Sequence, residues 1–363
     1  MKNRVLIVCT TDSMIWNFLI PHIKSLVSDG YYVECACSKT GFFYDRIIKD
    51  YGIILNRIDF DRSPYSIKNV RGYFKLIELI KNKKFDTVFC HEPVGGAIGR
   101  LAGHHCKCRV IYMAHGFHFY NGAPKFQRIY YWVEKFLAQF TDTLITINQE
   151  DYDASLNFKA KRKVKINGIG IDTSQFEHNP NPAYIRDELK IPRDGVVFLS
   201  VGELIERKNH EVVIRAFEKL AQKDYYYVIV GDGRLHDYLV DVINNHNLSD
   251  KVYLLGYRED INQLCNSADV FIMPSVQEGL SVALMEAMAC GKPVIASKIR
   301  GNTDLIDETK GGFLVNVYDV DGYVTALKEI VNYKQDYGEY NRKKVLQYDI
   351  SIITKNILDI FNL

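Results

Sequence analysis

Glu278 and Glu286 lie eight residues apart, in the segment of this chain whose residues are the strongest candidates for a functional site. A buried strand is expected over 269–273, and Ser275 and Gly279 after it are typical of a turn that leads into a helix. A helix start offers unpaired N–H groups and about half a positive charge, which suits a diphosphate. Glu286, about two turns along, would accept hydrogen bonds from two ribose hydroxyls. The segment therefore predicts a nucleotide-sugar site, with a surface helix carrying ordinary glutamates as the alternative.

A pair of cations follows another expected strand. The run over 196–201 is strand-like and leads into Gly202 and then into Arg207 and Lys208. We expect the two cations to neutralise a donor diphosphate. That group gains negative charge as its bond to the sugar breaks, so fixed cations are worth more in the transition state than in the ground state. A solvated Arg-Lys pair is the alternative.

Two further turns belong to the same series of strand ends. Gly231 follows the strand expected over 225–230, and position 236 holds histidine where a dinucleotide fingerprint needs a third glycine, so an NAD site is not expected. Arg258 follows the strand expected over 252–255, where it is either a further site residue or a surface charge. Ligands of open α/β sheets bind beyond the carboxyl ends of strands, so these turns predict one site.

The segment from Pro274 to Pro293, PSVQEGLSVALMEAMACGKP, resembles the retaining glycosyltransferases of family 4, whose signature is E-G-x6-E-A-M-A-x-G-x-P. The resemblance covers nearly the whole chain. In the first half, HGFHFY and FTDTLITINQEDY are similar to the bacterial capsule and exopolysaccharide branch. The resemblance implies a two-domain GT-B fold, a nucleotide diphosphate sugar donor, no metal and no cofactor besides the donor. Three D-x-D sequences occur, but none adjoins the nucleotide motifs.

The resemblance also implies residue roles. His115, after the strand expected over 110–113, corresponds to a residue beside the donor sugar that orients and stabilises without acting as a nucleophile. Asn209 stands where the family usually has glycine, which puts the backbone there in question. The catalytic set implied is His115, Glu278, Arg207 and Lys208. The donor-binding set implied is Gly202, Arg207, Lys208, Gly231, Arg258, Ser275, Glu278, Gly279, Leu280, Ser281 and Glu286.

Strand-like runs alternate with helical patterns along both halves of the chain, which is typical of α/β doubly wound sheets. The 363 residues and 47% hydrophobic content are sufficient for two buried cores. We expect a Rossmann-like domain over 1–172. The resemblance implies that this is the acceptor side and that a C-terminal helix at 349–363 crosses back to complete it. A nucleotide-sugar domain is expected over 178–345, with the active site in the cleft between the two.

The net charge of +2 conceals an asymmetry between the halves. Residues 1–175 hold 25 Lys and Arg against 16 Asp and Glu, and the remainder holds 21 against 28. The split favours an anionic partner for the first half, either a membrane surface or an acidic acceptor, with solvated lysines as the alternative. Residues 124–140 combine Lys and Arg with aromatic residues at helical spacing, which fits a helix lying on a bilayer or one packed on a core. No nucleic-acid partner is expected.

No apolar run is long enough to span a membrane, and the first ten residues lack a cleavage site, so we expect a cytoplasmic protein peripheral to the inner face of the cell membrane. The resemblance implies a retaining, metal-independent glycosyltransferase. It would move a hexose or N-acetylhexosamine from a UDP-sugar to a lipid-linked, polyprenyl diphosphate saccharide in surface polysaccharide biosynthesis. A UDP-N-acetylhexosamine 2-epimerase-like enzyme and a catalytically silent nucleotide-sugar sensor are the alternatives.

Overall fold

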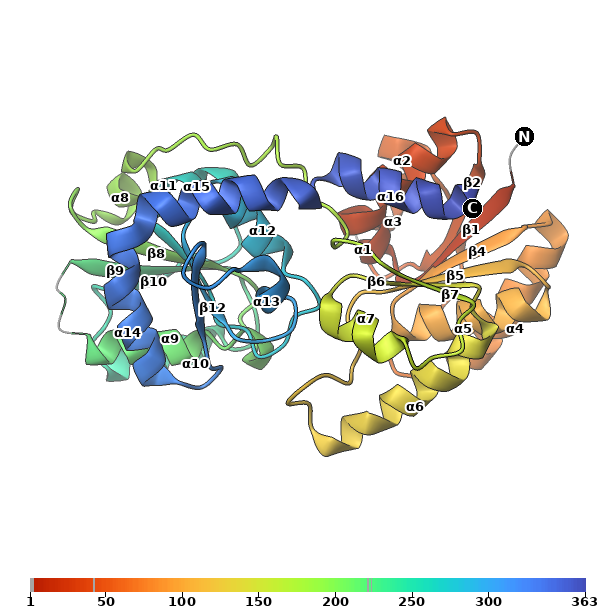
Figure 1. Cartoon of the computed structure of the whole chain (residues 1–363), viewed down its shortest axis with the longest axis horizontal. Coiled ribbons are helices and arrows are strands. Elements are labelled where there is room, and N and C mark those ends of the chain that lie inside the picture. The colour runs from red at the N-terminus through yellow and green to blue at the C-terminus, as the bar shows by residue number, and fades with distance from the viewer. Residues whose placement is uncertain (1–2, 42, 221, 223) are drawn as a thin grey trace. The chain divides into compact units, whose positions relative to one another are not determined.

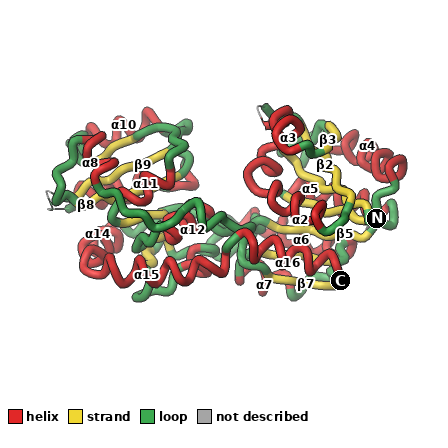
Figure 2. Tube along the Cα trace, turned by 90° about the horizontal axis from the view of Figure 1, so that it is seen from above, coloured by secondary structure: helices red, strands yellow, loops and turns green. Residues whose placement is uncertain are grey.

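The chain forms two compact units in a computed structural model that describes residues 3–41, 43–220, 222 and 224–363 (Figure 1). The first unit comprises Met1–Gly170 with Ile350–Leu363, and the second comprises Ile171–Asp349. Each unit contains one parallel sheet, and Figure 2 shows helices on both sides of each sheet. The two parallel α/β units expected from the alternating pattern are therefore confirmed.

The sheet of the first unit has the strand order β3-β2-β1-β4-β5-β6-β7 in the described residues. Its central strands are largely buried because helices cover both faces, and seven of the eight residues of β1 are buried. The strands are β1 (Arg4–Thr11), β2 (Tyr32–Ser38), β3 (Ile54–Arg57), β4 (Thr87–His91), β5 (Arg109–Ala114), β6 (Thr143–Thr146) and β7 (Arg162–Lys165). The helical segments are α1 (Asp12–Met14), the π-helical η1 (Ile15–Leu19), α2 (Ile20–Ser28), α3 (Phe43–Tyr51), α4 (Ile67–Lys83), α5 (Pro93–His105), η2 (Lys125–Gln127), α6 (Arg128–Leu137), η3 (Ala138–Phe140), α7 (Gln149–Ser155) and α16 (Ile350–Asn362).

The sheet of the second unit has the order β10-β9-β8-β11-β12-β13 in the described residues, again all parallel. The strands are β8 (Val196–Val201), β9 (Tyr225–Val230), β10 (Val252–Leu254), β11 (Val270–Met273), β12 (Val294–Ser297) and β13 (Gly312–Val315). The helical segments are α8 (Ala183–Leu189), η4 (Glu206–Lys208), α9 (His210–Lys219), α10 (His236–Asn245), α11 (Ile261–Ser267), α12 (Val282–Ala289), α13 (Asn302–Leu305), α14 (Val320–Ile330), η5 (Val331–Tyr333), α15 (Lys334–Val345) and η6 (Leu346–Tyr348).

The order of each sheet reverses at one place. In the first unit β1 lies between β2 and β4, and in the second β8 lies between β9 and β11. The connections on the two sides of such a point leave on opposite faces, so a crevice opens beyond the carboxyl ends of the two central strands. The fold therefore predicts ligand sites after β1 and β4 and after β8 and β11.

The C-terminal helix α16 belongs to the first unit, where it packs on α2. The guanidinium of Arg109 donates hydrogen bonds to the carbonyl oxygens of Ile360 and Phe361, at 2.7 and 2.8 Å. These carbonyls lie in the last turn, where a helix leaves its acceptors unpaired and favours a cation. The return of the C-terminal helix to the first domain is thus confirmed. In the described part of the chain, no helix has the length and apolarity to cross a bilayer.

Candidate functional site

The turns after β8 and β9 approach each other closely in the second unit. The Gly202 N–H donates to the Val230 carbonyl oxygen at 2.9 Å. Gly231 has φ +143°, and a Cβ atom on it would lie 2.0 Å from the Gly202 carbonyl oxygen. A side chain at position 231 would therefore separate the two turns. The two predicted glycines lie together, beside the place where the strand order reverses.

The predicted cations and the first glutamate form one cluster. Lys208 Nζ lies 2.8 Å from Glu278 Oε1, and Arg207 Nη1 lies 3.1 Å from the same oxygen. Glu278 is largely buried, which raises the pKa of its carboxyl, but the two cations and the Ser275 hydroxyl outweigh burial and leave the pKa lowered. Glu278 is therefore ionised at neutral pH, and the three side chains together carry one net positive charge.

Backbone contacts hold this cluster between the loops after β8 and β11. The Val276 N–H donates to the Arg207 carbonyl oxygen at 2.8 Å, and Arg207 Nη1 donates to the Gln277 carbonyl oxygen at 3.0 Å. Asn209 has the left-handed conformation, with φ +52° and ψ +37°, so it adopts the backbone that glycine would supply. Its amide donates to the carbonyl oxygens of Pro274 and Val317, which fixes the loop further.

The helix α12 begins directly after the Glu278 loop. The Ser281 hydroxyl oxygen accepts a hydrogen bond from the Leu284 N–H at 3.3 Å and so caps the helix. Leu280 is buried, and the carbonyl oxygen of Gly279 lies close to Gly301, where a Cβ atom would be 2.5 Å from it. The predicted turn residues thus lie at the N-terminus of a helix, where backbone donors favour an anion.

Glu286 lies within α12 and is mostly buried. No hydrogen bond or ion pair joins its carboxylate to any residue that the structure describes, and burial raises the pKa of this carboxyl to about 7. A carboxylate that is removed from water without a partner costs free energy unless a ligand supplies donors. Glu286 therefore has unused capacity to accept hydrogen bonds from hydroxyl groups.

Arg258 is engaged within the fold. Its guanidinium forms ion pairs with Glu188 and Asp260, each at 2.6 Å, and these acids raise its pKa. The Tyr184 hydroxyl also donates to Asp260. The side chain fastens α8 to the turn after β10, an arrangement that the sequence did not reveal. Its contact with a base stays a prediction.

His115 follows β5 in the first unit, and two histidines that the sequence analysis missed accompany it. His115 Nε2 and His91 Nδ1 are joined by a hydrogen bond of 3.0 Å, and His22 Nε2 is bonded to the Ile169 carbonyl oxygen at 2.9 Å. Burial, together with the neighbouring His22, lowers the pKa of His115 to about 3. His115 is therefore neutral at physiological pH and acts as a hydrogen-bonding group. A single histidine in an apolar strand end, as at His91, gives no sequence signal of its role.

Arg300 was also missed. It is buried after β12, and its Nε donates to the Glu278 carbonyl oxygen at 3.2 Å. The side chain thus supports the loop that carries the Glu278 cluster. Position 300 lies outside the E-x7-E segment, so the spacing of residues in the sequence did not link Arg300 to Glu278.

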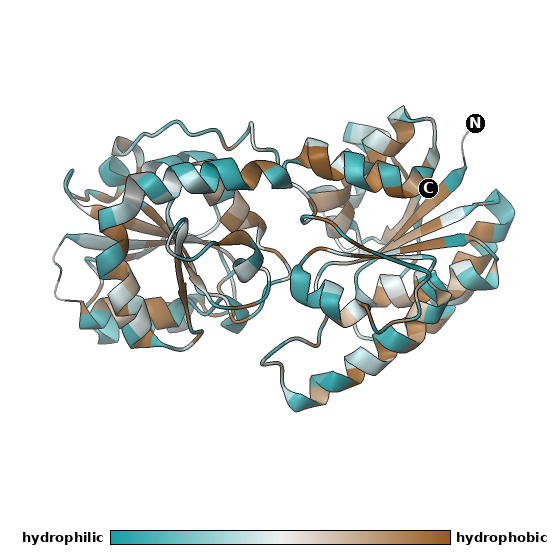
Figure 3. Ribbon diagram, in the orientation of Figure 1, coloured by the Kyte–Doolittle hydropathy of each residue, from teal (hydrophilic) through white to brown (hydrophobic). Residues whose placement is uncertain are grey.

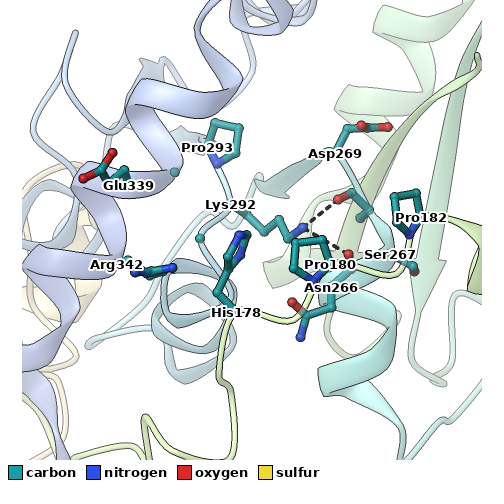
Figure 4. A pocket seen from close by; sticks show the side chains of 13 residues that line it. His178, Pro180, Pro182, Asn266, Ser267, Asp269, Lys292, Pro293, Glu339 and Arg342 are labelled. Atoms are coloured by element: carbon teal, nitrogen blue, oxygen red, sulfur yellow. Dashed lines mark hydrogen bonds between the residues drawn. The ribbon is translucent and has the colours of Figure 1, made fainter.

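A pocket of about 480 Å³ in the second unit lies apart from these residues (Figure 4). Its wall includes Ala268 and Pro293, which precede β11 and β12, so it lies at the amino ends of strands whose carboxyl ends carry the Glu278 cluster. Lys292 in this wall donates to the carbonyl oxygens of Asn266 and Ala268, at 3.3 and 2.9 Å. The ammonium therefore has a structural role, and no predicted site residue lines this pocket.

Two family models match the chain. The model described as "Glycosyl transferases group 1" matches residues 183–344, and "Glycosyl transferase 4-like" matches residues 4–148. The first match contains the complete Glu278 and Glu286 segment, and the second contains His115.

Similar proteins agree with these matches. "Putative glycosyltransferase EpsD" of Bacillus subtilis is 30% identical over 100% of this chain and 97% of its own length. "UDP-Gal:alpha-D-GlcNAc-diphosphoundecaprenol alpha-1,3-galactosyltransferase" of Escherichia coli is 33% identical over 74% of this chain and 72% of its own. Anabaena Alr3699/HepE, solved with UDP, has a TM-score of 0.82 at 20% identity over the whole of both chains. A sucrose-phosphate synthase of Thermosynechococcus elongatus has a TM-score of 0.79 at 18% identity, over 99% of this chain and 98% of its own. The GT-B fold is therefore confirmed.

Proposed function

Because the chain belongs to the family of group 1 glycosyl transferases, we propose that it transfers a hexose or N-acetylhexosamine from a UDP-sugar to a lipid-linked saccharide. The proposed product is a polyprenyl diphosphate saccharide of a bacterial surface polysaccharide. The transfer is proposed to retain the anomeric configuration and to need neither a metal nor a cofactor besides the donor.

The observation that carries the proposal is the mostly buried Glu286 carboxylate, which has no partner among the described residues and lies in the helix that follows the Glu278 cluster. A nucleoside diphosphate would supply hydrogen-bond donors to the Glu286 carboxylate and negative charge to the Glu278 cluster. Its ribose hydroxyls donate to the carboxylate, and its phosphates meet the helix N-terminus and the net positive charge of Arg207, Lys208 and Glu278. UDP is favoured because the Escherichia coli relative is named for a UDP-sugar and the Anabaena protein was solved with UDP.

The proposed chemistry depends on stabilising the leaving group. As the glycosidic bond breaks, negative charge grows on the diphosphate, and Arg207 and Lys208 offset it without reorganising. A leaving phosphate oxygen takes the acceptor proton on the same face of the sugar. His115 is neutral, so it is proposed to orient the donor sugar by hydrogen bonding.

The acceptor part of the proposal is supported by the name of the Escherichia coli relative, which acts on a GlcNAc linked to diphosphoundecaprenol. A UDP-release assay tests the whole proposal, with a panel of UDP-hexoses and UDP-N-acetylhexosamines and with GDP-sugars as controls. We expect one UDP-sugar to be consumed quickly only when a lipid-linked saccharide is present. Consumption of a GDP-sugar, or of a UDP-sugar at the same rate without acceptor, would contradict it.

The affinity for UDP should increase with pH through about 7. The ionised Glu286 is the better acceptor for two hydroxyl groups, and burial raises its pKa to about 7, so lowering the pH protonates it and removes that acceptor. Calorimetric titration between about pH 6 and pH 8 measures the effect, which approaches tenfold per pH unit on the acidic side. Glu286→Gln should flatten the dependence, and an unchanged slope in this variant would assign the titration to another group.

A membrane-facing surface is proposed on the first unit, formed by α4 and α6 with the residues that precede each of them. α6 places Ile129, Trp132, Val133 and Phe136 on its exposed side, and apolar and polar residues alternate along its ribbon (Figure 3). Residues 62–75 contain four Lys and Arg and no Asp or Glu. Exposed apolar side chains with flanking cations suit the headgroup region of an anionic bilayer.

Sedimentation with vesicles that contain phosphatidylglycerol should show salt-sensitive binding. Arg71→Ala should weaken it about fivefold, since one cation near an anionic surface contributes about 1 kcal/mol. Trp132, which is 64% exposed, should matter as well, so Trp132→Ser should also weaken binding. Lys343→Ala serves as the control because this exposed lysine lies in the second unit. Equal binding of all these proteins, or binding independent of salt, would exclude this surface.

A further inference from the structure

A cavity of about 600 Å³ in the first unit is not used by the donor chemistry. Thr10 at the end of β1, Glu92 after β4 and Gly116 after β5 line it, so it lies at the carboxyl ends of the strands where the sheet order reverses. Gly116 also follows His115 directly. The cavity therefore occupies the place where an open α/β sheet binds its ligand, and its volume is that of a small-molecule site.

The walls of the cavity are mainly apolar. They include Tyr65, Val94, Ile98, Phe117, Ile129 and Val133. Such walls bind a hydrocarbon by removing apolar surface from water, whereas a sugar would need several hydrogen-bonding groups.

The carboxylates in the wall are already engaged within the fold. Glu134 forms a bidentate pair with the buried Arg100, at 2.7 and 3.2 Å. Glu92 accepts hydrogen bonds from the N–H groups of Thr10 and Thr11, at 2.7 and 3.2 Å. With these groups occupied, an apolar ligand leaves no additional charge unpaired on entering.

The cavity reaches the proposed membrane-facing surface. Tyr65, Ile129 and Val133 line it and are also 91%, 61% and 44% exposed. Ile129 and Val133 belong to the exposed apolar side of α6, so this side continues into the cavity wall. Arg62 also lines the cavity and is exposed, which places a cation at the rim. An apolar chain with an anionic head therefore matches both the wall and the rim.

We infer that this cavity binds the isoprenoid units nearest the phosphate of a polyprenyl phosphate-linked acceptor, which enters from the membrane between α4 and α6. The inference rests on the proposed function and names the part of the acceptor that the first unit holds. An ordinary phospholipid is the competing source of an apolar chain with an anionic head, and the test below distinguishes the two.

Equilibrium binding of radiolabelled undecaprenyl phosphate in detergent micelles, without any sugar nucleotide, tests the cavity directly. Ala97→Phe places a ring in the wall, and Ile129→Ser removes an apolar side chain at the rim. Ala97→Phe should weaken binding of the probe at least about tenfold. Ile129→Ser should weaken it about fourfold or more, since one buried methylene corresponds to about fourfold in affinity. Ile352→Ser on α16, also an exposed isoleucine of the first unit, should bind like the wild type. Phosphatidylglycerol at equal concentration should not displace the probe.

A transfer assay separates failure of this inference from failure of the proposed function. The ratio of kcat/KM for a polyprenyl acceptor to that for the same saccharide diphosphate on a short alkyl chain should fall about tenfold in Ala97→Phe. If the wild type makes glycolipid but neither variant changes probe binding or this ratio, the inference is wrong and the function stands. Displacement of the probe by phosphatidylglycerol would also overturn it. If the wild type binds the probe but transfers no sugar, the proposed function fails and the cavity assignment stands.

Discussion

Glu286→Ala should weaken UDP binding about tenfold to a hundredfold without lowering the stability of the protein. The Glu286 carboxylate has no partner among the described residues, so its hydrogen-bonding capacity is available to the ligand. Hydrogen bonds to a charged group contribute about 1.5–3 kcal/mol, which corresponds to that range of affinity.

Calorimetric titration of UDP into the wild type and the variant measures this effect. Glu329→Ala is the matched control, because Glu329 is an exposed glutamate on a helix of the same unit. It should leave the affinity for UDP unchanged. An unchanged affinity in Glu286→Ala would mean that the ribose contact lies elsewhere, and the residues carried over from the family pattern would need reassignment.

The stability of a second variant, Glu286→Gln, provides an independent test of the Glu286 carboxyl. Burial raises the pKa of Glu286 to about 7 in the folded state, above the usual value in the unfolded chain, so the folded state favours the protonated carboxyl. The contribution of this group is therefore fully present below about pH 4 and is lost as the pH rises to about 7. At pH 8, Glu286→Gln should be more stable than the wild type by on the order of 1–3 kcal/mol. A less stable variant at pH 8 would mean that the ionised carboxylate has a partner in the fold.

Lys208→Met should lower kcat by about a hundredfold to a thousandfold, with a smaller change in the affinity for UDP. In the proposed mechanism Lys208 offsets the growing charge of the leaving diphosphate, and removal of one preorganised donor to a transition-state anion has about this effect. The mostly buried Glu278 keeps Arg207 as a partner at 3.1 Å, so the loop should remain folded.

Single-turnover kinetics measure the chemical step, and the melting temperature checks folding. Lys208→Arg should recover part of kcat because it restores a cation, although its planar head has a different geometry. Lys219→Met is the control, since Lys219 belongs to an exposed ion pair with Asp321 in the same unit and should not affect turnover. Loss of UDP affinity with kcat unchanged would instead assign Lys208 to uniform binding of donor and transition state.

The sequence predicted the parallel sheets well because their central strands are buried on both faces and so read as continuous apolar runs. It missed β3, β7 and β13, which are edge strands of the two sheets. β7 has the sequence RKVK with both ends exposed, and β3 is likewise exposed at both ends. A strand that is paired on one side and solvated has no hydrophobic pattern to identify it.

Within the candidate site, position along the chain was predictable and side-chain pairing was not. The expected turns after strands correctly placed Gly202 after β8 and Glu278 after β11, and the expected helix start placed Glu286 within α12. The contact of Glu278 with both Arg207 and Lys208 joins residues about 70 positions apart, and it depends on loop shapes that no periodicity encodes. The left-handed Asn209 shows the same limit, because its tertiary contacts with Pro274 and Val317 support a conformation that sequence leaves open.

The stereochemistry of the isolated product tests the central claim most directly. The protein is incubated with the UDP-sugar and the lipid-linked saccharide that support UDP release in the panel assay, and the glycolipid is analysed by nuclear magnetic resonance at the new anomeric centre. We predict a glycolipid that is longer by one sugar, in the same anomeric configuration as the donor. An inverted configuration would contradict retention, and an epimerised UDP-sugar formed without acceptor would contradict glycosyl transfer itself.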